Sequence, residues 1–106
     1  MVTIVAIITV RRAGLEAFRV FERRAAEVMT AHGGRIERTV VVADDSPELL
    51  KEIHVVTFPG ERAFRAYQQD PRLADLAPLR AEAVVSTEVL VGEDGPDYGG
   101  RHDRGA

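Results

Sequence analysis

The apolar and polar positions of this chain follow two different periods, and each change of period marks a new element. Residues 2–10, VTIVAIITV, are apolar on both alternating faces and rich in β-branched side chains, which predicts a central strand covered on both sides. Residues 15–31 place apolar side chains on one stripe and charged ones opposite, as an amphipathic helix does. Gly33 and Gly34 end this helix, because glycine readily adopts the left-handed cap conformation.

The remainder of the chain continues with the same two periods. Runs of apolar and β-branched residues predict three more strands, at residues 35–43, 51–58 and 84–91. Before the last strand, residues 61–69 have helical spacing. Asp70 and Pro71 then have the character of an N-cap followed by the first residue of a new short helix.

The element order β-α-β-β-α-β predicts an α+β fold of the ferredoxin-like type, a four-stranded antiparallel sheet with the helices on one face. Residues 1–92 are expected to form this domain, and residues 93–106 a polar C-terminal tail without a core of its own. The uncovered face is expected to be apolar, and Val41, Val56 and Phe58 are assigned to it. An exposed apolar face usually marks an interface, so we expect a homodimer that packs through its sheets.

Composition and charge narrow the range of partners. The 106 residues carry a net charge of −3 with basic and acidic side chains intermixed, which argues against nucleic acid, because phosphate contacts need a concentrated basic surface. The chain has no cysteine, which excludes disulfides and thiolate metal sites. Its apolar N-terminal run is too short to cross a membrane and lacks the charges of a signal peptide. We therefore expect a cytoplasmic protein with no membrane partner.

Several segments resemble a known family. They are HGGRIERT (32–39), HVVTFPGERAFRAYQQDP (54–71), LAPLRAEA (76–83) and TEVLVG (87–92). Over residues 2–92 the chain resembles the small bacterial proteins of the domain of unknown function 1330 family. More broadly it resembles the dimeric α/β-barrel superfamily, which includes NIPSNAP-like and antibiotic-biosynthesis-monooxygenase-like proteins. The resemblance implies two ferredoxin-like units packed sheet to sheet, with a cavity in each subunit between the sheet and its helices or the partner.

The resemblance leaves the reaction open. Activities in this superfamily include cofactor-independent oxygenation of aromatic polyketides, haem degradation, isomerisation, dehalogenation and simple ligand binding, so the fold alone selects none of them. The quinone-forming monooxygenases and the haem-degrading members carry a functional Trp and Asn, and this chain contains neither residue. The resemblance therefore points away from those two activities.

One predicted strand carries candidate chemistry. In the run EIHVVTFPG, Glu52 and His54 lie two residues apart and so share a face, while Ile53 and Val55 share the other. Because the helix-covered face is expected to be apolar, we assign Ile53 and Val55 to the helix side and Glu52 and His54 to the opposite side. That side is expected to carry further polar or aromatic residues, namely Glu37, Thr39, Phe58, Ser86 and Glu88.

A histidine beside carboxylates suits general acid–base catalysis, because it exchanges a proton near neutral pH and a carboxylate fixes its tautomer. We therefore assign His54 as the catalytic acid/base, helped by Glu52 or Glu37. The alternative is a hydrogen-bonded histidine at the contact between two sheets. A metal site that joins these residues to Glu88 needs three or four converging ligands, and we expect no metal.

Tyr67 and Arg80 are expected to orient a substrate, because a phenol and a guanidinium bind carboxylates or phenolates; structural roles are the alternative. The predicted binding residues are Tyr67, Arg80, Thr39, Phe58, Ser86 and Glu88. The expected function is cofactor-independent isomerase/cyclase-like or monooxygenase-like chemistry, such as isomerisation, cyclisation or proton abstraction. Its substrate is expected to be an apolar, aromatic or polyketide-like small molecule of secondary metabolism. The alternative is a non-catalytic homodimeric ligand-binding or interaction module.

Overall fold

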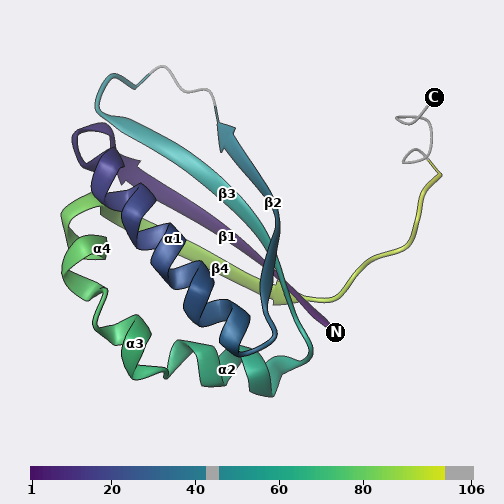
Figure 1. Cartoon of the computed structure of the whole chain (residues 1–106). Coiled ribbons are helices and arrows are strands. Elements are labelled where there is room, and N and C mark those ends of the chain that lie inside the picture. Colours follow the sequence, from purple (N-terminus) through teal and green to yellow (C-terminus); the bar gives the residue numbers. More distant parts are fainter. Residues whose placement is uncertain (43–45, 100–106) are drawn as a thin grey trace.

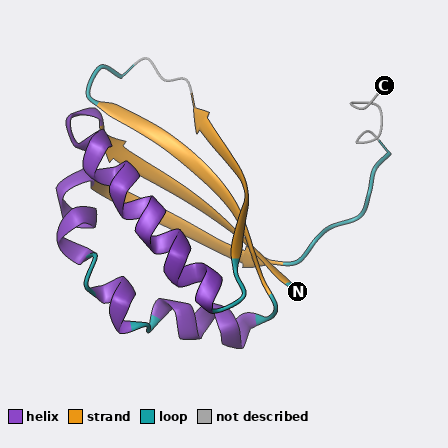
Figure 2. Ribbon diagram, viewed as in Figure 1, coloured by secondary structure: helices purple, strands orange, loops and turns teal. Residues whose placement is uncertain are grey.

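The fold is an antiparallel sheet with its helices on one face. The computed structural model describes residues 1–42 and 46–99. Along the chain the elements are β1 (Val2–Arg11), the 3₁₀ turn η1 (Arg12–Gly14), α1 (Leu15–Ala31), β2 (Arg35–Val42), β3 (Leu49–Phe58), α2 (Glu61–Gln68), α3 (Pro71–Ala74), α4 (Ala77–Ala83) and β4 (Val84–Gly92). The strands are ordered β2-β3-β1-β4 and neighbours run antiparallel, with the helices on one side (Figures 1 and 2). This is the predicted ferredoxin-like α+β fold.

The element boundaries follow the predictions with one informative difference. The predicted end of the second strand, at residue 43, lies outside the described residues. The short helix that begins after Asp70 does not continue to β4 but stops as α3, and α4 starts separately after Leu76. Pro78 lies in the first turn of α4. Proline lacks a backbone N–H and its ring clashes with the carbonyl four residues earlier, so one continuous helix through this point is excluded.

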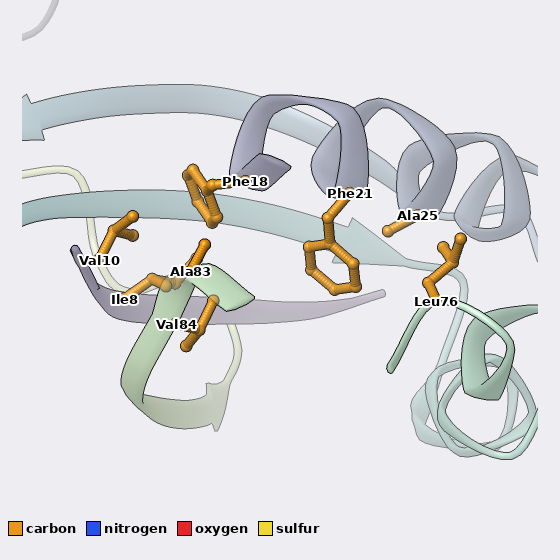
Figure 3. Packing of buried hydrophobic residues seen from close by; sticks show 8 residues of the cluster. All are labelled: Ile8, Val10, Phe18, Phe21, Ala25, Leu76, Ala83 and Val84. Atoms are coloured by element: carbon orange, nitrogen blue, oxygen red, sulfur yellow. The ribbon is translucent and has the colours of Figure 1, made fainter. Parts of the chain in front are cut away.

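The main core lies between α1, α4 and the sheet. Its buried residues come from strands and helices that are far apart in the sequence (Figure 3): Ile8, Val10, Phe18, Phe21, Ala25, Leu76, Ala83 and Val84. Phe18 and Val10 are completely buried. Burying a side chain of the size of Phe18 contributes about 1.5–3 kcal/mol relative to leaving it exposed, so the stripe of α1 accounts for much of what holds the helix on the sheet.

A second core cluster joins the other end of the sheet to α2. It consists of Val2, Ile4, Met29, Val56, Phe58 and Phe64. The assignment of Val56 and Phe58 to the uncovered face is therefore wrong. The even-numbered residues of β3 are buried from Leu50 to Phe58, because the alternation of the strand turns all of them toward the helices.

Asp70 ties the end of α1 to the start of α3. Its carboxylate accepts hydrogen bonds from the backbone N–H of Arg72 at 2.8 Å, which confirms the predicted N-cap, and from the Arg72 guanidinium at 3.1 and 2.8 Å. The Nε2 atom of His32, at the end of α1, lies 2.8 Å from the same carboxylate. The hydrogen bonds from Arg72 and then from His32 hold the pKa of Asp70 far below its usual range.

The depressed pKa of Asp70 predicts a loss of stability in acid. Its contribution is complete above the unfolded-state value of about 3.9 and is lost as the pH falls below that value. Urea unfolding at about pH 6 and pH 2.5 measures how much of the free energy of unfolding is lost in acid. This loss should be smaller for Asp70→Asn than for the wild type, because the amide keeps a cap acceptor but does not titrate. Equal acid losses in the two proteins would contradict this role.

The opposite face of the sheet is apolar at its centre. The strand register forms two rows across it, Val40–Ile53–Ile7–Glu88 and Arg38–Val55–Val5–Leu90. We call the apolar members of these rows the open-face patch: Val5, Ile7, Val40, Ile53, Val55 and Leu90. None of the described helices covers this patch.

No helix of the described residues has the length and apolar character needed to cross a membrane.

Candidate functional site

A cavity of about 290 Å³ lies between the helices and the sheet. Its walls are mostly apolar, and its polar lining consists of Glu22, His54, Tyr67, Gln68, Arg80 and Thr87. Thr87 and Val89 also line it, although both are exposed on the helix side of β4. The cavity therefore opens to solvent beside β4. Its volume is close to the lower end of the range of about 300–1,000 Å³ for ligand pockets, which suits a small, largely apolar molecule.

Four charged or titratable side chains form a continuous chain of contacts in one wall. The Arg19 guanidinium contacts Oε2 of Glu52, and Oε1 of Glu52 lies 2.8 Å from Nε2 of His54. On its other side, Nδ1 of His54 lies 3.3 Å from Oε2 of Glu22. The Glu52 side chain is 2% exposed and that of Glu22 is 19% exposed. We call these four residues the buried quartet.

Two elements build the quartet through their ordinary periods. Glu52 and His54 lie two residues apart in β3 and therefore point to the same face, while Arg19 and Glu22 lie three apart on one side of α1. The prediction that Glu52 and His54 face away from the helices is wrong. They are buried against α1, and Ile53 lies on the open face instead. A polar pair is tolerated there because α1 supplies a matching partner for each member.

Glu22 and His54 lie close enough to exchange a proton. Glu52 contacts a guanidinium, so it acts as an acceptor and Nε2 of His54 donates to it. The hydrogen on Nε2 leaves Nδ1 facing Glu22. Burial raises the pKa of Glu22; the nearby His54 acts against this shift, and Glu52 adds to it. A proton placed between Glu22 and Nδ1 of His54 is therefore within reach of both groups, at the edge of the cavity.

Tyr67 and Arg80 supply the other polar groups of the lining. Burial, together with the nearby Glu22, raises the pKa of Tyr67 to about 12, so its phenol keeps its hydrogen and can donate it. The Tyr67 ring packs beside Phe58 and Phe64 with centroid distances of 5.4 and 6.5 Å. The Arg80 guanidinium donates a hydrogen bond from Nη2 to Oγ1 of Thr87 at 2.9 Å, which fixes it beside β4.

The predicted site residues do not all come together. The cavity lining contains His54, Phe58, Tyr67 and Arg80, and Glu52 lies directly behind His54. The catalytic and binding roles assigned to them stay predictions.

The other four predicted residues do not line the cavity. Glu37 follows Ile36 at a break in the strand register and accepts a hydrogen bond from Thr57 at 2.8 Å, and Ser86 and Glu88 pair with open-face residues of β1. The prediction that these residues share a face with His54 is wrong because His54 faces the helices. Ser86 and Glu88 lie on the opposite face, as predicted, and Glu37 bonds to Thr57 of that face. Thr39 is in register with His54 but is exposed and does not line the cavity.

Arg19 and Glu22 are the residues that the sequence analysis missed. Both lie among the charged residues of the helix, where Arg19 is expected to face solvent. The sequence contains one signal for them. A basic and an acidic residue lie three apart in the helix, and an acidic residue and a histidine lie two apart in an otherwise apolar strand, so each residue of one pair has a partner of suitable charge in the other. Over residues 1–42 and 46–99, no cluster of three His or acidic side chains has the arrangement of a metal site.

Comparisons of the sequence with known families and curated proteins find no match. No family model matches the chain, so the resemblance to the domain of unknown function 1330 family stays a prediction. No curated protein matches it either.

Solved structures, however, are similar over most of the chain. One is a cofactor-independent oxygenase from Streptomyces nogalater, with a TM-score of 0.65 and 22% identity, covering 93% of this chain and 97% of the other. A second is an antibiotic biosynthesis monooxygenase, with a TM-score of 0.66 and 13% identity, covering 91% and 100%. A third is a dimeric protein of unknown function with a ferredoxin-like fold from Bacteroides fragilis, with a TM-score of 0.63 and 15% identity, covering 88% and 95%. At these identities the similarity establishes the fold and not the activity.

Proposed function

We propose that the cavity binds a small, largely apolar molecule with a carbonyl group and that the protein moves a proton on it without a cofactor. The observation that carries this proposal is the Glu22–His54 pair, which lies in the wall of the cavity with Nδ1 and Oε2 3.3 Å apart. A carboxyl group whose pKa is raised by burial works as an acid or base closer to neutral pH than an exposed one. The fold similarity to a cofactor-independent oxygenase is compatible with cofactor-free chemistry, as an analogy only.

The proposed step is proton abstraction next to the carbonyl. The Glu22 carboxylate removes the proton from carbon, and the electron pair of the C–H bond moves to the carbonyl oxygen to form an enolate. Tyr67 donates a hydrogen bond to that oxygen, which stabilises the developing charge. Glu22 and His54 then hold the proton between them until it returns to the same or another carbon, which gives exchange or isomerisation respectively. Glu52 and Arg19 act through His54 by keeping its tautomer fixed.

The proposal is tested by the exchange of acidic C–H protons in a neutral probe ketone. With 2-tetralone in D₂O, ¹H NMR should show that the protein accelerates loss of the α-proton signals beyond buffer alone. His54→Gln should slow this exchange by about 10²-fold or more, the scale of a lost acid–base partner. Glu88→Gln is the matched control on the other face of the sheet, and it should exchange at the wild-type rate. Binding of 2-tetralone without any exchange would contradict catalysis and favour the non-catalytic binding module.

We also propose that the open-face patch is the homodimer interface. A dimer would remove Leu90, which is 50% exposed, and its five apolar neighbours from water. The rows that cross the patch end in Glu88 at β4 and in Arg38 at β2, so opposite charges lie at its two rims and suit an isologous contact.

Leu90→Lys should weaken this dimer by about tenfold or more, because it places an unpaired charge in a desolvated interface. Val91→Lys is the matched control: Val91 is the next residue, is 47% exposed and points to the helix side. Sedimentation equilibrium should show a weakened dimer for the first variant and the wild-type dimer for the second. A monomeric wild type, or equal effects of the two substitutions, would contradict the proposed interface.

A further inference from the structure

The lining of the cavity carries a net positive charge when the Glu22–His54 pair holds a proton. In the buried quartet, the positive charge of Arg19 offsets the negative charge of Glu52. Glu22 and His54 together are neutral when they share one proton, whichever of them holds it. The quartet as a whole is therefore neutral in the state with one proton, and Arg80 adds one positive charge to the cavity lining.

Arg80 lacks a carboxylate partner among residues 1–42 and 46–99. The one side-chain hydrogen bond of Arg80 in this part of the chain is the 2.9 Å contact to the Thr87 hydroxyl, whereas Arg65 pairs with Glu61 and Arg72 with Asp70. A guanidinium has five N–H donors in a planar fork that matches a carboxylate. The contact to Thr87 occupies one of them and holds the group at the wall.

The position of Arg80 directs its free donors to a ligand. It belongs to α4 and reaches Thr87 on the helix side of β4, where the cavity opens to solvent. Arg80 is also close enough to Glu22 to lower the pKa of its carboxyl against the effect of burial. The lining of the cavity thus combines the exposed cation of Arg80, apolar residues such as Phe21 and Phe58, and the more buried Glu22–His54 pair.

We infer that the ligand of this cavity is a monoanion, an apolar body of one or two rings with a single carboxylate that Arg80 binds at the mouth. This inference rests on the proposed ligand-binding role of the cavity. A single guanidinium balances one negative charge, so a phosphate with two charges is a poorer match. The carboxylate at Arg80 leaves the opposite end of the molecule beside Glu22. Arg80 thereby determines both which molecules bind and which end of them meets the proton-carrying pair.

The test compares two probes that differ only in charge, 2-naphthoate and 2-naphthamide. The chain has no Trp, so naphthalene fluorescence reports their binding without interference from indole. The wild type should bind the carboxylate at least about tenfold more tightly than the amide, in line with one charge-assisted hydrogen-bonded pair. Arg80→Gln should bring the ratio close to one, and Arg80→Lys should retain part of it, because the ammonium keeps the charge without the fork.

Arg65→Gln is the matched control, since Arg65 is a paired arginine on the neighbouring helix outside this cavity, and it should keep the wild-type ratio. Equal binding of the two probes by the wild type, or a preference that survives Arg80→Gln, would overturn the inference. If the wild type exchanges the protons of 2-tetralone but binds both naphthalene probes equally, the inference about a monoanionic ligand is overturned and the proposed chemistry is not. A preference for 2-naphthoate in a protein that exchanges no protons would uphold it and contradict the proposed chemistry.

Discussion

Arg19→Met is expected to lower the free energy of unfolding by about 1–3 kcal/mol, the scale for leaving one buried polar partner unsatisfied, because Glu52 is buried while the Arg19 side chain is 37% exposed. Glu52 is 2% exposed, so without the guanidinium its buried carboxylate keeps His54 as its one side-chain partner among residues 1–42 and 46–99. Methionine retains most of the apolar stem of arginine, so lost packing adds little to the effect. Urea unfolding at neutral pH measures the change.

Two further variants distinguish the loss of the Arg19–Glu52 pair from a general destabilisation of α1. Glu52→Gln in the Arg19→Met background should recover most of the lost stability, because a buried amide costs less than an unpaired buried charge. Arg23→Met is the control: Arg23 is exposed on the same helix, and its substitution should change stability by no more than about 0.5 kcal/mol. A double variant as unstable as Arg19→Met would show that the pair is not the cause.

Glu22→Gln is expected to slow the exchange of 2-tetralone α-protons by about 10²–10⁴-fold, the contribution of a positioned acid–base group. Glutamine keeps the size of the side chain and its ability to hydrogen bond to His54, but it cannot take a proton. Binding of 2-naphthoate should therefore persist, and the effect should appear in the rate and not in the affinity. ¹H NMR exchange and fluorescence titration of the same variant make the two measurements.

The stability of Glu22→Gln provides the second half of this prediction. Burial raises the pKa of Glu22 in the folded protein, so the ionised carboxylate opposes folding and this penalty grows as the pH rises through the ordinary glutamate range. The variant should be at least as stable as the wild type above that range. A variant that loses both stability and exchange would indicate that Glu22 is a structural residue rather than a base.

The sequence was sufficient for the fold because each element carries its own local signal. The apolar run of β1, the stripe of α1, the stop at Gly33 and the cap at Asp70 all lie where the pattern predicts. The face of β3 could not be predicted from the strand alone. The rule that the covered face is apolar fails at Glu52 and His54, since their burial depends on Arg19 and Glu22 from a distant segment.

The other site residues differ in how far their positions could be predicted. Tyr67 and Arg80 reach the cavity because their helices lie over the sheet, which follows from the fold. Glu37 lies at a register shift after Ile36 that leaves no mark in the amino-acid pattern, and it bonds to Thr57 on the face opposite His54. Ser86 and Glu88 lie on the open face, as predicted. They are separated from the site because Glu52 and His54 of β3 face the helices instead.

The proposed chemistry requires that His54 and Glu22 share a proton in the wall of the cavity. Long-range ¹H–¹⁵N correlation spectra of the imidazole test it most directly, because they report each ring nitrogen separately. At neutral pH Nε2 should carry a hydrogen, and Glu22→Gln should shift the Nδ1 resonance and leave Nε2 protonated. A His54 ring with a bare Nε2, or an Nδ1 resonance that does not respond to Glu22→Gln, would contradict it.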